Sequence, residues 1–425
     1  MDYRIFPPEE ILETTVALPA SKSLLTRAMI MNHVGGRRAD EGLADAADVC
    51  DDTRTLRTIL AAGLPTDGAT VDVGPAGTAM RFLCALCAAT VGTDCVLTGT
   101  ERMQQRPIGP LVEALRALGA EVEYTGREGF PPLHIRGCKL RGGELEVDAA
   151  VSSQYISALM MVAPLMAAPL TLKLRGNVQS LPYIQMTAAM MSRRGVETDV
   201  DRDTVAVGPG QYTRPADDAL EPDWSAAAFW YEIAALSAGW VTLPGLRDDS
   251  LQGDRHSAPL FERLGVLTEF TEEGAELSST PDLYSHLDSD MSDMPDAVPA
   301  LAVTACLAGI RFELTGVGAL HHKESDRLEA LVTELGKLGA QLEIEGYGTV
   351  LKWDGSRRPV RELPEFDTYG DHRMAMALAP VAIFVPGIVV RDVEVVNKSY
   401  PGFWDALRQA GFTLADPSEP IHEVE

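Results

Sequence analysis

The feature that most constrains the fold is a sequence pattern that occurs six times along the chain. Each copy has apolar residues at three- and four-residue spacing, then a glycine, then a short stretch of alternating apolar and polar residues. This order is typical of an amphipathic helix, a left-handed cap and a half-exposed strand. Successive copies lie 56, 76, 70, 74 and 72 residues apart, counted between the glycines Gly63, Gly119, Gly195, Gly265, Gly339 and Gly411.

The repetition predicts a chain built from six similar units. One copy would indicate little, because helix, glycine and strand follow one another in many α/β proteins, but six copies at near-constant spacing are harder to dismiss. Since 425 residues exceed what one hydrophobic core usually holds, we expect two α/β domains of three units, with sheets facing a bundle of helices. The crossover between the domains is expected at Ala219–Trp224, in an acidic segment that contains a proline.

Composition excludes several classes of partner. A net charge of −26 argues against nucleic acid and anionic membranes. No apolar run reaches membrane-spanning length, and no basic stretch followed by an apolar one opens the chain, so we expect a cytoplasmic protein. Cys84 and Cys87 form a C-x-x-C pattern, but their apolar surroundings predict buried thiols instead of a metal or redox site.

The basic residues of this acidic chain gather in short motifs, which points to anionic ligands. Lys22, Ser23 and Arg27 lie at the start of an apolar stretch, where the free N–H groups of a helix end attract anions. Gly77 lies in a turn of small residues, and Arg106 precedes an amphipathic helix. Taken singly, these motifs are equally explained as a capped helix, a plain turn and a basic surface loop.

Two further motifs offer hydroxyl and amide groups. Ser152, Ser153 and Gln154 open an uncharged, methionine-rich helix, and Ser180 and Tyr183 flank a proline. Each set can simply cap a helix. Each can also supply neutral hydrogen-bond donors to a phosphate.

The densest charged motif lies in the C-terminal half. Lys323, Glu324 and Arg327 fall within five residues, after two adjacent histidines and ahead of an amphipathic helix. Adjacent histidines point apart, and no carboxylate or cysteine cluster completes a shell, so we expect no metal.

Three other motifs of this half carry single candidates. Arg373 ends the run Asp371-His372-Arg373 before an uncharged stretch, and Lys398 precedes the last copy of the repeat. Asp296 comes before an apolar helix, where an aspartate is more often an N-cap than a base.

Nine segments, in this order, resemble one family over nearly the whole chain: the EPSP synthase (3-phosphoshikimate 1-carboxyvinyltransferase) family. They are LPASKSLLTR, AGTAMRFL, LTGTERMQQRPIG, VSSQYISALMMVAP, SLPYIQMT, MPDAVPALAV, KESDRL, GDHRMAMA and KSYPGFW. The resemblance implies the enolpyruvyl transferase fold, an inside-out α/β barrel in which each of two domains has three βαβαββ-type units. It implies that residues 19–222 form a lobe for shikimate 3-phosphate, and that residues 1–18 and 223–425 form a lobe with phosphoenolpyruvate contacts and the catalytic acids.

The resemblance also implies residue roles. The catalytic residues would be Asp296, Glu324 and Lys22. The phosphoenolpyruvate-binding residues would be Lys22, Gly77, Arg106, Arg327, Arg373 and Lys398. The residues that bind shikimate 3-phosphate would be Ser23, Arg27, Ser152, Ser153, Gln154, Ser180, Tyr183, Asp296 and Lys323.

Charge supports this assignment independently. Each substrate carries a phosphate and a carboxylate, and the motifs of both halves supply seven cations for these four groups. Closure of the two lobes should therefore assemble the site and strengthen its contacts by expelling water. In the implied addition and elimination, Asp296 takes the proton of the 5-hydroxyl, and either Glu324 or Lys22 protonates C3 of phosphoenolpyruvate. We expect a monomer that needs no cofactor.

Two other functions are compatible with the sequence. The first is that of the sister transferase of UDP-N-acetylglucosamine, which usually has a reactive cysteine on a glycine-rich loop; this chain has no cysteine in such a loop. The second is that of a non-catalytic phosphosugar-binding protein, which would not need both Asp296 and Glu324.

The sequence departs from the family at several positions. The departures are Pro75 for Asn, Phe82 for Pro or Leu, Pro222 and Trp224 for small residues, and Ala319 for Asn.

Overall fold

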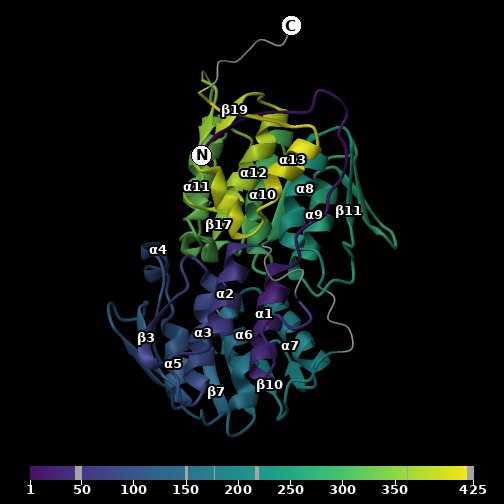
Figure 1. Cartoon of the computed structure of the whole chain (residues 1–425). Helices are drawn as coiled ribbons and strands as arrows, with labels where there is room; N and C mark the ends of the chain where they lie inside the picture. Colours follow the sequence, from purple (N-terminus) through teal and green to yellow (C-terminus); the bar gives the residue numbers. More distant parts are fainter. Residues whose placement is uncertain (44–49, 149–151, 177, 216–219, 361, 419–425) are drawn as a thin grey trace. The chain divides into compact units, whose positions relative to one another are not determined.

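The computed structural model describes residues 1–43, 50–148, 152–176, 178–215, 220–360 and 362–418. The chain forms two compact units (Figure 1). The N-terminal unit comprises Ala20–Glu221 and Leu251–Gly253, and the C-terminal unit comprises Met1–Pro19, Pro222–Ser250 and Asp254–Glu425. Ala219, where the expected crossover begins, lies outside the described residues.

The N-terminal unit alternates helices and short strands. Its helices are α1 (Lys22–Val34), α2 (Asp51–Ala62), α3 (Gly77–Ala89), α4 (Glu101–Gln104), α5 (Gly109–Ala117), α6 (Ser153–Val162), η1 (Ala163–Leu165) and α7 (Leu181–Arg193). Its strands are β3 (Thr66–Asp72), β4 (Asp94–Thr98), β5 (Glu121–Tyr124), β6 (Leu133–Arg136), β7 (Gly143–Asp148), β8 (Leu170–Arg175), β9 (Thr198–Val200) and β10 (Thr204–Val207).

The C-terminal unit alternates in the same way and includes the first two strands of the chain. Its helices are α8 (Trp224–Leu236), η2 (Gly253–His256), α9 (Ser257–Arg263), η3 (Pro295–Ala297), α10 (Val298–Ala308), η4 (Gly318–His322), α11 (Arg327–Lys337), α12 (His372–Leu378), η5 (Ala379–Ile383), η6 (Val393–Lys398) and α13 (Phe403–Gln409). Its strands are β1 (Tyr3–Phe6), β2 (Glu13–Thr15), β11 (Trp240–Pro244), β12 (Val266–Phe270), β13 (Gly274–Ser279), β14 (His286–Asp290), β15 (Arg311–Thr315), β16 (Glu343–Glu345), β17 (Val350–Trp353), β18 (Glu365–Phe366), β19 (Ile388–Val390) and β20 (Thr413–Ala415).

The strands of the described residues form five four-stranded sheets with one shared topology. Their orders are β3-β4-β6-β5, β7-β8-β10-β9, β2-β11-β13-β12, β14-β15-β17-β16 and β18-β19-β1-β20. In each, the first pair is parallel and the next two pairs are antiparallel. In four of these sheets the parallel pair is joined through helices, as a parallel connection requires, which gives the βαβαββ unit that the resemblance implied. In the fifth, the parallel strands β2 and β11 are separated in the chain by the whole N-terminal unit.

The six glycines of the repeat lie at helix ends, as predicted, although Gly63, with a ψ of 160°, lies outside the left-handed helical region. All six have positive φ angles, between 81° and 102°, a conformation that glycine adopts without a steric penalty. The sixth predicted sheet is absent from the described residues. Because β1 and β2 pair within the C-terminal unit, the described residues of the N-terminal unit contain no strand before α1. The strand after Gly63 is β3, which pairs with β4. The described sheets are small and separate, and none of them closes into a barrel.

Helices with little or no charge fill the centre of each unit. Helix α3 packs against α6 in the N-terminal unit, and α10 packs against α8 and α12 in the C-terminal unit. These helices are apolar on all sides because all their sides are buried. Cys84 and Cys87 lie in α3 with no exposed surface, as predicted. Among the described residues, no helix has the length and apolarity needed to cross a membrane.

Candidate active site

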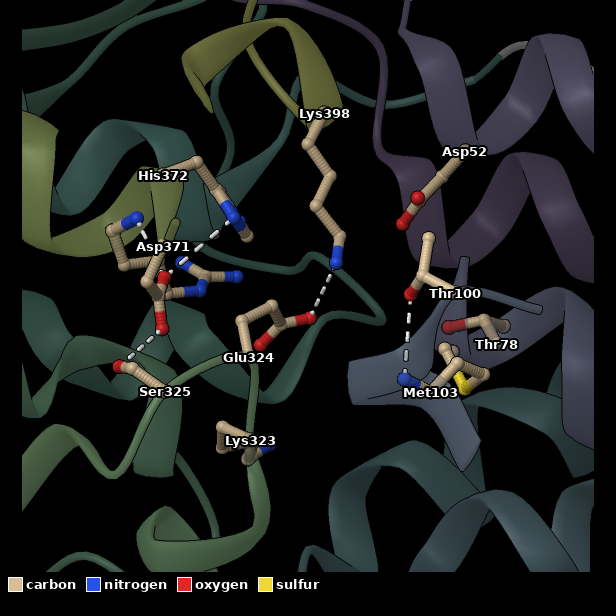
Figure 2. Close-up of polar contacts among 12 residues, drawn as sticks. Asp52, Thr78, Thr100, Met103, Lys323, Glu324, Ser325, Asp371, His372 and Lys398 are labelled. Atoms are coloured by element: carbon tan, nitrogen blue, oxygen red, sulfur yellow. Dashed lines mark hydrogen bonds and ion pairs between the residues drawn. The ribbon is translucent and has the colours of Figure 1, made fainter. Parts of the chain in front are cut away.

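Seven charged side chains of the C-terminal unit form one cluster of ion pairs, which we call the acid–base cluster. They come from η3, from the loop between η4 and α11, and from the starts of α11 and α12 and the end of η6. Figure 2 shows part of the cluster, with Lys398 directed at Glu324 and Ser325 at Asp371. The seven residues are Asp296, Lys323, Glu324, Arg327, Asp371, Arg373 and Lys398.

Arg327 is the centre of this cluster. It is 1% exposed, and its guanidinium donates to three carboxylates. Nε and Nη2 donate to the two oxygens of Asp371 at 2.8 and 3.3 Å, Nη1 donates to Asp296 at 2.8 Å, and Nη2 also donates to Glu324 at 3.0 Å. Burial alone would lower the pKa of Arg327, but these three negative charges outweigh burial and raise it.

Asp296 is surrounded by positive charge. Its carboxylate accepts from Arg327, lies 2.9 Å from Nη2 of Arg373, and lies 3.3 Å from Nζ of Lys323. Burial favours the protonated acid, but Arg373, Lys323 and Arg327 together hold the pKa of Asp296 well below its usual range. Asp296 is therefore ionised at neutral pH, as a general base must be.

Glu324 lies between two cations. Its Oε2 accepts from Arg327, and its Oε1 lies 3.0 Å from Nζ of Lys398. The side chain keeps about 15% of its surface exposed. Glu324 thus joins Lys398 to the rest of the cluster through its contact with Arg327.

Asp371 is a member of the cluster that sequence reasoning did not assign to the site. It has no exposed surface and caps α12 by accepting from the backbone N–H of Arg373 at 2.9 Å. Ser325 donates to the same carboxylate at 3.1 Å. Burial would raise the pKa of Asp371, but the charge of Arg327 lowers it. Its place directly before an uncharged helix was the available signal, since such an aspartate is a favoured cap.

Asp254 is a second acid that was missed. It is 2% exposed and hydrogen-bonded by the hydroxyl of Ser225. Burial, followed by the negative charge of Asp296, raises the pKa of Asp254 to about 6. No pattern in the sequence marked this residue.

The two histidines before the cluster do not form a metal site. Nδ1 of His321 lies 2.7 Å from Oδ2 of Asp326, and Asp326 caps α11 by accepting from the backbone N–H of Glu329. In the described ranges, no group of three histidine, cysteine, aspartate or glutamate side chains is arranged to hold an ion. His321 therefore stabilises the start of α11 instead.

In the N-terminal unit, Lys22 and the glycine turn lie at the first residues of helices. Lys22 opens α1 and donates to Asp52 at 3.1 Å; Asp52 is 4% exposed and was not predicted. Gly77 opens α3, and a methyl group added to it would lie 2.6 Å from Nη1 of Arg106 and 3.0 Å from Nη1 of Arg81. The glycine thus allows two buried guanidinium groups to approach the first turn of α3, where the helix dipole favours an anion.

Arg27 lies deeper, 2% exposed, among neutral groups. It donates to the hydroxyl groups of Thr187 and Ser157 and to the backbone carbonyl of Ser23. Its guanidinium carbon lies 5.8 Å from the ring centre of Tyr183. Three residues predicted to bind one substrate, Ser23, Arg27 and Tyr183, are thus brought together.

The remaining predicted residues lie at two more helix starts. Ser152 caps α6 by accepting from the backbone N–H of Gln154, and Ser153 is buried in the first turn. Gln154 donates to the hydroxyl of Thr78 in α3 at 3.3 Å, so the starts of α6 and α3 are neighbours. Ser180 precedes α7 with a φ of 56°, which is unusual for a residue with a side chain.

Comparisons with known proteins show which family the chain belongs to. Residues 43–407 match the sequence model of the family described as EPSP synthase (3-phosphoshikimate 1-carboxyvinyltransferase). A protein of that name from Bacteroides fragilis (strain YCH46) is 45% identical over 416 residues, which cover 97% of this chain and 99% of the relative. One from Methanoculleus marisnigri is 34% identical over 413 residues, covering 92% and 96%.

Solved structures show the same fold. An EPSP synthase from Acinetobacter baumannii has a TM-score of 0.71 at 18% identity, with 98% of this chain and 100% of that chain covered. The enolpyruvyl transferase NikO from Streptomyces tendae has a TM-score of 0.71 at 16% identity, with 97% and 98% covered. At these identities the likeness describes the architecture alone.

Proposed function

We propose, from the premise that this chain belongs to the EPSP synthase family, that it transfers the enolpyruvyl group of phosphoenolpyruvate to the 5-hydroxyl of shikimate 3-phosphate and releases phosphate. The observation that carries the proposal is the ionised Asp296 among Arg327, Arg373 and Lys323. A base surrounded by cations is what a reaction between two anionic substrates requires, because the same cations can bind the substrates.

Phosphoenolpyruvate would be bound by cations of both units. Arg327, Arg373 and Lys398 of the acid–base cluster would bind one end of the molecule. Lys22, Gly77 and Arg106 are the contribution of the N-terminal unit. Bidentate guanidinium contacts suit both the phosphate and the carboxylate of this substrate.

Shikimate 3-phosphate would be bound mainly by the N-terminal unit. The hydroxyl and amide groups at the starts of α6 and α7 suit a phosphate, and Arg27 suits an anionic group. The proposed residues are Ser23, Arg27, Ser152, Ser153, Gln154, Ser180 and Tyr183, with Asp296 and Lys323 of the C-terminal unit. That substrate binding closes the two units on each other stays a prediction of the sequence.

The ion pairs around Asp296 suggest when it becomes a base. Substrate phosphate and carboxylate groups would compete for Arg327 and Arg373 and so draw positive charge away from Asp296. The pKa of Asp296 would then rise from its depressed value, and the carboxylate could accept a proton.

The reaction would then proceed in two steps, an addition and an elimination. The oxygen of the 5-hydroxyl attacks C2 of phosphoenolpyruvate as its proton passes to Asp296, and C3 takes a proton from Glu324 or Lys22. The same group, now in its base form, then takes a proton from C3, and the double bond re-forms as the phosphate leaves. We propose that the protein acts in the cytoplasm as a monomer without a cofactor.

A phosphate-release assay with purified variants tests the proposal. Asp296→Asn should lower kcat by about 10²–10⁴-fold, while calorimetry still detects binding of shikimate 3-phosphate. Asp326→Asn is the matched control, because Asp326 caps the neighbouring helix α11 but lies outside the acid–base cluster. Unchanged turnover in Asp296→Asn would refute its role as the base, and phosphate release with only UDP-N-acetylglucosamine as acceptor would overturn the choice of substrate.

A further inference from the structure

Arg27 is a buried cation whose partners are all neutral. Its Nε donates to Oγ1 of Thr187 at 2.7 Å, Nη2 to Oγ of Ser157 at 3.2 Å, and Nη1 to the carbonyl oxygen of Ser23 at 2.9 Å. No carboxylate in the described part of the chain pairs with it. Buried charges in proteins are normally paired with an opposite charge, so this arrangement is unusual.

The two hydroxyl groups come from two different helices that pack on α1. Ser157 lies in α6 and Thr187 in α7, and neither has any exposed surface. The Thr187 hydroxyl lies 2.9 Å from Oγ of Ser157 and 2.8 Å from the carbonyl oxygen of Tyr183, so its own proton also has an acceptor. The pair is therefore fixed in place and presents lone pairs to the guanidinium.

The remaining neighbours of Arg27 are aromatic. The ring centre of Phe82 lies 5.3 Å from the guanidinium carbon, and that of Tyr183 lies 5.8 Å away. Aromatic faces attract a cation without cancelling its charge. Phe82 is one of the positions at which the sequence departs from its family, and the structure places this ring against the cation.

The lack of a negative partner affects the pKa of Arg27. Burial lowers the pKa of Arg27 to about 10, and the only opposing effect comes from Tyr183. The guanidinium is thus charged at neutral pH but lacks a compensating negative group. Of its five N–H donors, three have the partners named above, and no described residue accepts from the other two.

We propose that Ser157 and Thr187 are specificity-determining positioning residues, which hold Arg27 by neutral acceptors so that its full charge selects an anionic substrate. The proposal rests on the proposed function of Arg27 in binding shikimate 3-phosphate. An aspartate at either position would hold the guanidinium at least as firmly, but would supply the negative charge that the substrate should supply.

The test compares Ser157→Asp with Ser157→Asn, which differ in charge and hardly in size. The aspartate should raise the KM for shikimate 3-phosphate about 10- to 100-fold relative to the asparagine, the range expected when one charge-assisted contact is lost. The KM for phosphoenolpyruvate should change little, and the midpoint of thermal unfolding should be no lower than that of the asparagine variant. A merely structural role predicts no difference in KM between the two variants, and that result would overturn the proposal.

A second pair keeps the proposal testable if the aspartate variant does not fold. Thr187→Val removes the acceptor of Nε and should raise the KM for shikimate 3-phosphate several-fold, whereas Thr187→Ser should restore it. Thr304→Val is the matched control, because Thr304 is equally buried and its hydroxyl also donates to the carbonyl four residues earlier. Among the described residues, no arginine hydrogen-bonds to Thr304. Equal effects of the two valines on KM would contradict the proposal.

Arg27→Met distinguishes the proposed role of Arg27 in substrate binding from the proposed role of Ser157 and Thr187. If this variant binds shikimate 3-phosphate like the wild type, Arg27 does not contact the substrate and the proposed function of this residue fails. If Arg27→Met loses binding but Ser157→Asp retains it, only the role of the neutral acceptors is refuted.

Discussion

Glu232 is a buried acid in the core of the C-terminal unit. It belongs to α8, has no exposed surface, and neither carboxylate oxygen has a hydrogen bond in the described part of the chain. Burial raises the pKa of Glu232 well above its ordinary value of 4.5. We therefore predict that Glu232→Met, which keeps the volume of the side chain and removes its polar atoms, stabilises the C-terminal unit.

Two effects contribute to the gain in unfolding free energy that we expect of Glu232→Met. Burying a polar group without a hydrogen bond costs about 1–3 kcal/mol, which methionine avoids. In addition, the unfolded chain releases the proton of Glu232 above pH 4.5, whereas the folded chain keeps it. The stability of the wild type is thus intact below pH 4.5 and falls as pH rises towards the folded pKa, by about 1.4 kcal/mol per pH unit. Between pH 5 and pH 7, the advantage of the variant should grow by up to about 2.7 kcal/mol.

Tryptophan fluorescence during urea unfolding measures this difference. The five tryptophans all lie in the C-terminal unit, so the signal reports the unit that contains Glu232. Glu334→Met is the control: Glu334 is equally buried, but it accepts from Lys337, from the backbone N–H of Asp367 and from Tyr369. This control should lose at least about 1–3 kcal/mol, because buried donors are left unpaired. An advantage of Glu232→Met that is the same at pH 5 and pH 7, or a destabilisation at both, would refute the reasoning.

Three other predictions follow from the candidate site. Gly77→Ala should raise the KM for phosphoenolpyruvate about 10- to 100-fold, with little effect on the KM for shikimate 3-phosphate, because the added methyl group would displace Arg106 by a substantial part of 1 Å. Steady-state kinetics with each substrate varied measures both KM values, and two unchanged values would contradict this prediction. Asp371→Asn removes one of the three buried negative charges around Arg327 and should cost about 1–3 kcal/mol in urea unfolding, because Asp296 and Glu324 still compensate the guanidinium. A stability equal to that of the wild type would be evidence against that pair. Asp254→Asn should gain stability over the wild type as pH rises from 3.8 and level off near pH 6, where Asp254 itself ionises; a gain that continues above pH 7 would contradict the assignment.

Much of the fold could be predicted from short-range patterns. The repeat glycines predicted helix ends with positive φ, and all six have them, because a left-handed cap depends only on the residue at that position. The sixth sheet is not found among the described residues, for a reason that no local pattern contains. Strands β1 and β2 pair with β19 and β11, far along the chain, and a strand's partner is not encoded in its own alternation.

The cations of the site were likewise easier to predict than the acids that pair with them. Lys22 and Arg327 stood out because a strongly acidic chain has few basic motifs. Their partners Asp52 and Asp371 lie 30 and 44 residues away and occupy helix starts, where an acid already has a structural explanation. A cap and a partner of a catalytic group have the same local sequence, so only the folded chain distinguishes them.

The uncharged central helices explain why the site residues lie at helix starts. Helices α6 and α10 have no charged residue at all, and the one charged residue of α12 is in its first turn. A helix that is buried on all sides can place a polar group only near its ends without the cost of an unpaired buried charge. Of the two ends, the N-terminus has free N–H groups and a positive dipole, which favour anions. A protein whose substrates are both anionic therefore has its binding residues at the N-terminal ends of its most apolar helices. Ser153, Asp296 and Arg373 lie at such ends, of α6, α10 and α12.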